Sequence, residues 1–176
     1  ETYVVLRLVS WDASHDIGQK GFNIDTLLKL IAEIKNHARV FISAENKIPK
    51  ILKKYQLSIN PTEIHDVLSF AELFIGEGAT MASECAIMGT PSIYINSLSA
   101  GTLEDQEQKG ILYMYKSSNG LIEKTREILT NPKAKEETKQ KSKDLFKNKI
   151  DINIFFYWLI SEYPKSVLNY KNNSTI

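Results

Sequence analysis

The residues best suited to hold a ligand lie in the stretch IGEGATMASECAIMG, residues 75–89. Gly76 and Gly78 have no side chains, so the backbone there can approach a bound molecule closely. Ala79 and Thr80 are expected to begin a helix, whose free N–H groups carry about half a positive charge and attract phosphate. The Thr80 hydroxyl adds one more hydrogen-bonding group. This chemistry predicts a phosphate site.

A carboxylate follows at helical spacing. Glu84 lies one helical turn past Thr80, so both side chains are expected near one face of the helix. Its two oxygens could accept the hydroxyl groups of a ribose through charge-assisted hydrogen bonds. The alternative is that Gly76–Thr80 is a bare strand-to-helix turn and Glu84 a solvated helix residue, because a G-x-G pattern alone is a weak signal.

A second polar cluster is the segment SWDASHDIGQKG, residues 10–21, which follows an apolar run. A histidine beside carboxylates can be held charged or oriented for proton transfer. His15 and Asp16 are therefore the candidate catalytic residues. The alternative is that the Asp and Ser side chains cap the loop and His15 is simply exposed.

A third cluster is the run Glu104-Asp105-Gln106-Glu107. Its carboxylates and amide could hold sugar hydroxyls. The same acidic cluster is equally expected at a helix start, where negative charge is favourable.

Metal and thiol chemistry have little support in the sequence. No H-x-H, H-E-x-x-H or C-x-x-C spacing occurs, so we expect neither a structural nor a catalytic metal site. His37 and His65 fall on helical patterns and are expected to be structural. Cys85 lies mid-helix among small apolar residues, which predicts a buried, unreactive thiol.

Composition excludes several classes of protein. The net charge of +1 gives no electrostatic argument for a nucleic-acid partner. A single cysteine excludes an internal disulfide framework and fits a reducing compartment. No apolar run approaches the roughly 20 residues that a membrane span needs. We therefore expect a cytoplasmic protein with neither a membrane span nor a nucleic-acid partner.

Strand and helix patterns alternate along the chain and must position these residues. Apolar runs typical of buried parallel strands occur at Tyr3–Val9, Ala38–Ser43, Leu57–Ile59, Leu73–Ile75, Ser92–Ile95 and Ile111–Tyr115. Such alternation predicts a Rossmann-like, three-layer α/β domain with a mostly parallel sheet of about six strands. Ligands of such sheets bind beyond the carboxyl ends of the strands, where Ser10–Gly21, Gly76–Thr80 and Asn96–Asp105 are expected.

Helical patterns fill the intervals. Apolar residues recur at three and four from Ile24 to Ile34, after the N-cap candidate Asn23, and Gly89 is expected to cap a helix over Ala79–Met88. Further helices are expected at Ile48–Tyr55, Glu63–Phe70, Leu121–Leu129, 133–149 and 151–162. We expect one domain over residues 1–163 and a flexible tail over 164–176. Because the chain opens on Glu1 with a strand close behind, we interpret it as a piece of a longer protein.

The order of these motifs resembles the C-terminal half of GT-B nucleotide-sugar enzymes, which include glycosyltransferases and the non-hydrolysing UDP-N-acetylglucosamine 2-epimerases. The phrases RLVSWDASHDIGQKGF, FISAE and IGEGATMASECAIMGTPSIYINS resemble most closely the prokaryotic family DUF354 of that superfamily. The resemblance covers most of residues 3–164. It implies a nucleotide-sugar, with UDP-sugar as the expected donor, and no metal or other cofactor.

The resemblance also implies roles for residues. The turn of Gly76, Gly78, Ala79 and Thr80 would meet the donor diphosphate, and Glu84, rather than the more conspicuous Glu77, would hold the ribose hydroxyls. The donor sugar would be contacted by Gln106 with Asp105 or Glu107.

Two further segments match by position. The connection Asn60–Ile64 falls where backbone groups read the base. Residues 10–21 match the loop that faces the interdomain cleft, and Ser10 at its start is expected to contact the ligand. The epimerases carry a basic His-Arg-Arg-Glu-type sequence in that loop, and SWDASHD stands here instead, which disfavours epimerase chemistry.

Three functions follow as hypotheses. The first is the donor-binding domain of a GT-B-type glycosyltransferase, whose N-terminal domain would supply the acceptor site, so that the fragment alone would turn over little. The second is a nucleotide-sugar epimerase or hydrolase domain. The third is a non-catalytic α/β interaction module, with a dimer interface on the aromatic last helix, residues 151–162.

Overall fold

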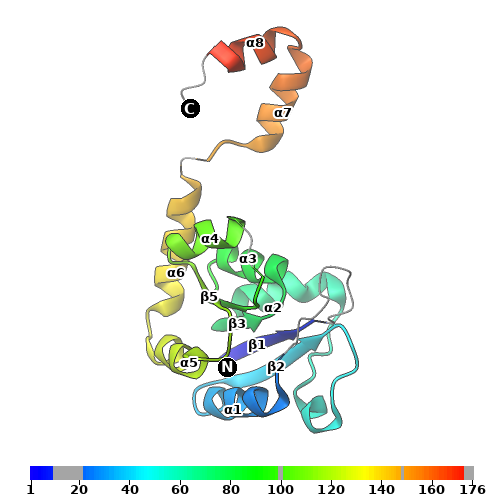
Figure 1. Ribbon diagram of the computed structural model, residues 1–176, viewed down its shortest axis with the longest axis vertical. Helices are drawn as coiled ribbons and strands as arrows, with labels where there is room; N and C mark the ends of the chain where they lie inside the picture. Colours follow the sequence, from blue (N-terminus) through cyan, green and yellow to red (C-terminus); the bar gives the residue numbers. More distant parts are fainter. Residues whose placement is uncertain (10–21, 99–100, 148, 173–176) are drawn as a thin grey trace. The chain divides into compact units, whose positions relative to one another are not determined.

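A sheet of parallel strands forms the centre of the computed structural model, which describes residues 1–9, 22–98, 101–147 and 149–172. Within these residues the strands are β1 (Tyr3–Leu8), β2 (Arg39–Ala44), β3 (Leu73–Gly76), β4 (Ser92–Ile95) and β5 (Leu112–Tyr115). Their order is β2-β1-β3-β4-β5, and all pairs are parallel (Figure 1). Parallel neighbours need crossover connections, which the helices supply. The predicted three-layer α/β fold is confirmed.

Helices α1 (Ile24–Ile34) and α5 (Leu121–Thr130) cover one face of the sheet (Figure 1). Alternate strand residues, which share a face because the strand period is two, join the apolar stripes of both helices in one buried cluster. Its members include Val4, Leu6, Leu27, Ile31, Ile42, Leu73, Ile75, Ile93, Leu121 and Ile128.

The other face is covered by α2 (Ile64–Phe70) and α3 (Ala79–Met88), with α4 (Gly101–Gln108) beside α3. Side-chain hydroxyls tie these helices to the strands. The Tyr3 hydroxyl donates to the Val67 carbonyl at 2.7 Å, and Ser92 Oγ donates to the Ala82 carbonyl at 2.8 Å. Further along the chain, α6 (Ala134–Phe146) packs on the end of α3, where Ser142 Oγ donates to the Ile87 carbonyl at 2.5 Å.

The strand order reverses direction between β1 and β3. The chain leaves β1 to form β2 on one side, and then crosses to form β3 on the other side. Arg7 and Gly76 are register partners at this boundary, next to the carboxyl ends of both strands. Such a topological switch point is where open α/β sheets bind ligands, and it places the candidate site.

Short-range signals set the helix ends. The Asn23 side chain accepts a hydrogen bond from the Asp25 N–H and begins α1. Gly89 ends α3 with φ of +86°, and a Cβ there would lie 2.9 Å from the Lys139 Cα. Both predicted caps are confirmed, and glycine is needed at position 89 for conformation and for space.

The strand predicted over Leu57–Ile59 does not form. The short helix η1 (Lys50–Tyr55) ends one residue before an isolated parallel bridge between Gln56 and Ile42, in which the Leu57 N–H donates to the Ile42 carbonyl at 2.8 Å. A capping box then binds the backbone of Asn60 and starts the helical turn η2 (Pro61–Glu63). Pairing beside β2 is thus reduced to one bridge, and the described sheet has five strands instead of about six.

The chain divides into two compact units, Glu1–Asp144 and Leu145–Ile176. The second contains α7 (Ile152–Ser161) and α8 (Lys165–Asn172), which meet through the rings of Phe155 and Tyr170 at 5.7 Å between centroids. Residues 165–172, expected to belong to a flexible tail, therefore form a helix. The expected domain, residues 1–163, spans the first unit and α7 of the second.

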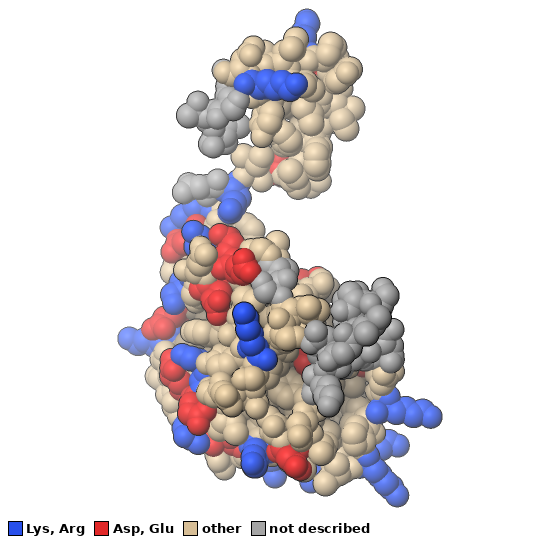
Figure 2. All heavy atoms as spheres, in the orientation of Figure 1, with Lys and Arg blue, Asp and Glu red and all other residues tan. Residues whose placement is uncertain are grey.

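Helix α7 is apolar on all sides, and none of its residues is buried. The side chains of Ile154, Tyr157 and Ile160 are 68–76% exposed. The visible face of this unit is accordingly dominated by uncharged residues (Figure 2). A dimer through this helix stays a prediction.

An ion pair between α1 and α5 predicts a pH dependence of stability. Glu33 accepts hydrogen bonds from Arg126 Nε at 2.7 Å and Nη2 at 2.8 Å, and its side chain is 13% exposed. Arg126, with a smaller contribution from His37, lowers the pKa of Glu33 from 4.5 to about 2. The pair therefore stabilises the fold fully above pH 4.5, and its contribution is lost as the pH falls toward 2.

We expect Glu33→Gln to be less stable than the wild type at pH 7 in urea unfolding. The difference should shrink as the pH falls from about 4.5 to about 2. Glu127→Gln is the control, since Glu127 pairs with Lys124 at 2.6 Å but is 64% exposed, and it should change stability less. A difference that is constant over this pH range would contradict the prediction.

Candidate functional site

A buried glutamate organises the switch point. The Glu77 side chain follows β3 directly, and the residue is 4% exposed. Oε2 accepts a hydrogen bond from the Val9 N–H at 3.1 Å, and Oε1 accepts one from the Phe22 N–H at 2.6 Å. Val9 and Phe22 are the two ends of the connection between β1 and α1, so one carboxylate fixes both.

The backbone of Glu77 is held as well. Its N–H donates to the Arg7 carbonyl at 3.3 Å, and its carbonyl accepts from Asn96 Nδ2 at 3.1 Å, just after β4. Sequence reasoning passed over Glu77 in favour of Glu84. One feature of the sequence could have indicated its role. A charged residue between two glycines, directly after an apolar strand, needs hydrogen-bond partners when its side chain is buried.

Gly76 is required by packing. A Cβ at this position would lie 2.5 Å from Phe74 Cζ and 2.9 Å from Arg7 Cβ. At Gly78, by contrast, the nearest atom would be Val9 Cγ1 at 3.4 Å, and φ is −90°. Gly76 is therefore fixed by the core, whereas Gly78 has room for a side chain, and its contact with a ligand stays a prediction.

The start of α3 keeps free N–H groups at the carboxyl edge of the sheet. Gly78 is its N-cap and offers no side-chain hydrogen bond. The first intrahelical bond runs from the Ala82 N–H to the Gly78 carbonyl at 3.1 Å, so the N–H groups of Ala79, Thr80 and Met81 precede it. With Thr80 exposed, this helix end can receive an anion.

Glu84 faces α2 from the middle of α3. Its Oε2 lies 3.2 Å from His65 Nε2, and the two side chains are 43% and 58% exposed, respectively. His65 was expected to be structural, but it is accessible and in contact with the predicted ribose carboxylate. No helical pattern could show this, because the contact joins two helices.

The connection before α2 is closed by a capping box. Asn60 Oδ1 accepts a hydrogen bond from the Thr62 N–H at 3.1 Å, and Glu63 Oε2 accepts one from the Asn60 N–H at 3.1 Å. The predicted base-reading connection, Asn60–Ile64, thus holds a fixed backbone conformation at the start of α2. Base reading itself stays a prediction.

The acidic-glutamine segment lies in α4, where two of its members bind the protein itself. Gln106 is 5% exposed, and its Nε2 donates to Ser83 Oγ at 2.6 Å. Glu107 Oε1 accepts from the Met114 N–H of the edge strand β5 at 2.8 Å. Asp105 is half-buried. Among described atoms, the buried Gln106 Oε1 has no partner, so an unmet acceptor lies beside α3.

Three predicted residues, Ser10, His15 and Asp16, lie outside the described residues. Their places as ligand-binding and catalytic residues stay predictions. The described ends of their segment, Val9 and Phe22, meet at Glu77.

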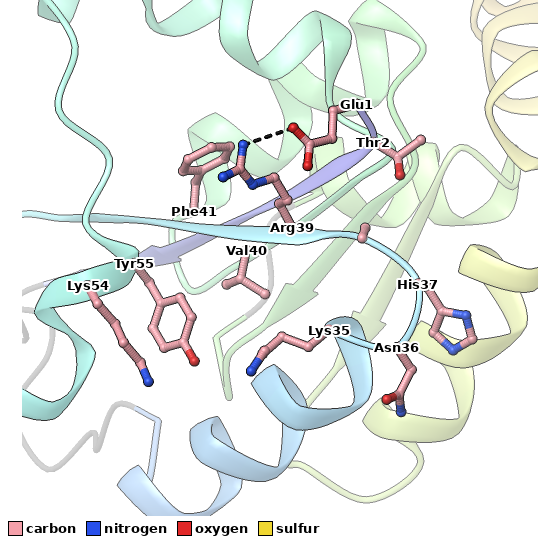
Figure 3. A pocket seen from close by; sticks show the side chains of 11 residues that line it. Glu1, Thr2, Lys35, Asn36, His37, Arg39, Val40, Phe41, Lys54 and Tyr55 are labelled. Carbon is pink, nitrogen blue, oxygen red and sulfur yellow. Dashed lines mark hydrogen bonds and ion pairs between the residues drawn. The ribbon is translucent and has the colours of Figure 1, made fainter.

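Two hollows flank the sheet at opposite ends. One of about 240 Å³ lies at the carboxyl ends of β1 and β2, lined by Leu8, Phe22, Ile48 and Glu77 among others. The other, of about 540 Å³, lies at the start of β2 and is lined by charged side chains such as Lys35, Arg39 and Lys54 (Figure 3). Because ligands of such sheets bind at the carboxyl edge, the smaller hollow belongs to the candidate site.

The described residues offer little for thiol or metal chemistry. Cys85 is fully buried, as predicted, and burial, with a smaller contribution from Glu84, raises the pKa of its thiol. Within the residues placed by the structure, no group of three or more His, Cys, Asp or Glu side chains could hold a metal ion. Over the same residues, no helix has the length and apolar character to cross a membrane.

Comparison with known proteins identifies the fold. No protein-family model and no curated protein sequence matches the chain. A structure described as a UDP-N-acetylglucosamine 2-epimerase from Listeria monocytogenes is 10% identical, with a TM-score of 0.57, and the match covers 79% of this chain and 40% of that one. The glycosyltransferase VinC, solved in complex with dTDP, is 15% identical with a TM-score of 0.54, covering 82% and 38%.

The wall teichoic acid polymerase TagF is 11% identical, with a TM-score of 0.55, over 82% of this chain and 38% of its own. At these identities the likeness establishes the fold, which is that of GT-B glycosyltransferases and a nucleotide-sugar epimerase. The chain spans about two fifths of the length of these proteins.

The two hydrogen bonds that the Glu77 side chain accepts can be tested by substitution. In Glu77→Gln, the amide would have one acceptor oxygen, so the N–H of either Val9 or Phe22 would face a donor. We expect a loss of stability of about 1–3 kcal/mol, the cost of one unsatisfied buried hydrogen-bonding group. Urea unfolding measures the loss, and hydrogen exchange should be faster at the Val9 and Phe22 amides. Unchanged exchange at both amides would show that Glu77 does not hold the connection.

Proposed function

We propose that this chain is the donor-binding half of a GT-B-type glycosyltransferase of the DUF354 kind, and that it binds a nucleotide-sugar, with a UDP-sugar as the expected donor. One observation carries the proposal. The uncapped start of α3 leaves β3 at the switch point of the sheet, and Glu84 follows half-exposed on the same helix.

The N–H groups at the start of α3 are the proposed seat of the diphosphate. They and the helix dipole favour negative charge where the backbone is bare of side chains. The Thr80 hydroxyl adds one hydrogen bond. Because this seat is built from N–H groups, we expect nucleotide binding to need no divalent metal ion.

The ribose would be held by Glu84. Its carboxylate is accessible from solvent, and it lies more than one turn into α3. A phosphate at the helix start would thus place the sugar of a nucleotide along α3, toward Glu84. The base would lie over the Asn60–Ile64 connection, whose backbone groups could read its edge.

In this arrangement, α4 would contact the donor sugar. Gln106 Nε2 and Glu107 Oε1 bind Ser83 and Met114. We therefore expect the sugar hydroxyls to meet Asp105 and the unpartnered Gln106 Oε1. The acceptor site would come from a preceding domain. His15 and Asp16 remain the proposed catalytic residues at the cleft.

Uridine nucleotides should stabilise the chain. Ligand at about 100 times its Kd adds about 2.7 kcal/mol of stability, which raises Tm by several degrees in a domain of this size. Glu84→Ala removes a carboxylate that accepts two charge-assisted bonds, so we expect affinity to fall about 10–100-fold. Thermal shift with UDP, GDP and CDP in the presence of EDTA measures both effects.

Glu127→Ala is the matched control for this experiment, because Glu127 is an exposed glutamate on α5, on the opposite face of the sheet. It should leave the shift by UDP unchanged. If no nucleotide raises the Tm of the wild type, the proposed function is wrong.

The second candidate is a nucleotide-sugar epimerase, which the likeness to the Listeria monocytogenes structure favours. The two reactions differ in products. We expect the longer protein to release UDP from its donor only when an acceptor is present, as transfer requires. Conversion of UDP-N-acetylglucosamine into its 2-epimer without acceptor, detected by NMR, would support the epimerase.

A further inference from the structure

We infer that His65 is a positioning residue of the nucleotide site. Its imidazole orients the Glu84 carboxylate toward the ribose hydroxyls, and this contact makes the site prefer ribonucleotides to 2′-deoxyribonucleotides. The inference rests on the proposed function, because it assumes that Glu84 receives the ribose.

The position of His65 in the fold brings it to the correct end of the sheet. Helix α2 precedes β3 and crosses back over the sheet, so its first turn lies near the carboxyl ends of the strands. His65 is the second residue of that turn. Since α3 starts at the same edge, the two helices present His65 and Glu84 to one another.

The contact restricts the carboxylate. His65 Nε2 lies 3.2 Å from Glu84 Oε2, and among the described residues it is the only side chain that hydrogen-bonds this carboxylate. A carboxylate has about four lone-pair directions, of which the imidazole uses one. Oε1 and the second direction of Oε2 remain, which suits two adjacent hydroxyls.

The start of the helix that carries His65 is fixed by hydrogen bonds. The capping box between Asn60 and Glu63 fixes the turn immediately before α2. A half-exposed Glu84 would otherwise lose rotamer freedom when a ligand binds. With His65 in place, part of that ordering is already present in the unliganded protein.

A second His–Glu contact shows what a purely structural pair looks like in this chain. His37 Nε2 lies 3.3 Å from Glu33 Oε1, at the amino end of β2. There Glu33 is 13% exposed and accepts two bonds from Arg126. Glu84 is 43% exposed, and no arginine of the described residues forms such a fork with its Oε1. The Glu84 carboxylate therefore keeps acceptor positions that Glu33 uses for Arg126. A substitution of His37 supplies a matched control for one of His65.

The test compares UDP with 2′-deoxy-UDP by calorimetry on four variants of the full chain. We expect the wild type to prefer UDP. His65→Ala should lower the affinity for UDP about fivefold, the effect of one hydrogen bond of modest strength, and lower that for 2′-deoxy-UDP by less, since this nucleotide offers one of the two hydroxyls. His65→Gln, whose amide N–H can still reach Glu84, should restore most of the preference. In Glu84→Gln, which has one acceptor oxygen instead of two, the preference should be weaker than in the wild type.

Further outcomes separate this inference from the proposed function. His37→Ala should bind both nucleotides like the wild type, and thermal melts check that every variant folds. If UDP binds and Glu84→Gln weakens it, but His65→Ala keeps both affinity and preference, the inference is overturned while the proposed function stands. If neither nucleotide binds the wild type, both the proposed function and this inference are wrong. Equal losses of UDP and 2′-deoxy-UDP in His65→Ala would also overturn it, because a general packing role predicts that result.

Discussion

Glu77 joins three chain segments that are far apart in sequence, two through its carboxylate and one through its backbone carbonyl. It receives the N–H groups of Val9 and Phe22, while its own carbonyl accepts the amide of Asn96. Each of these bonds lies at the carboxyl edge, where β1, β3 and β4 end. A buried charge is stable only when its hydrogen bonds are made. The loop ends at this edge are therefore held by the side chain and the backbone of one residue. The start of α3 is presented from the same residue onward.

Residues of the GEGAT turn divide between packing and binding. Glu77 and Gly76 serve packing. The Glu77 side chain accepts hydrogen bonds within the protein, and the side chains of Phe74 and Arg7 occupy the space beside Gly76. Gly78 and Ala79 are partly exposed and Thr80 is exposed, at a helix start without a side-chain cap. A similar division runs through α4, where Gln106 and Glu107 support α3 and β5. At this edge of the sheet, the residues that hold the protein together are therefore next to the residues that are open to a ligand.

Local patterns predicted most of the fold. Helix α3 and strand β4 begin and end where the sequence indicated, because apolar periodicity and the Gly89 cap are short-range signals. The strand predicted at Leu57–Ile59 does not form, because pairing beside β2 stops after one bridge at Gln56 and the chain turns into the Asn60 capping box. Strand propensity does not contain this tertiary outcome. For the site, the sequence indicated the bare turn, but neither the burial of Glu77 nor the contact of His65 with Glu84. Both depend on which elements meet across the sheet, and a one-dimensional pattern does not report such contacts.

The fit between Gly76 and Phe74 has a consequence for how this sequence can change over time. The Phe74 ring occupies the volume in which a Cβ of residue 76 would stand, with Arg7 closing the third side. A side chain at position 76 therefore requires that the residue at 74 becomes smaller or its ring turns away, and that Arg7 shifts as well. Natural relatives of this chain should exchange the two positions together, a large residue at 74 with glycine at 76, and a smaller residue at 74 wherever alanine or serine replaces that glycine.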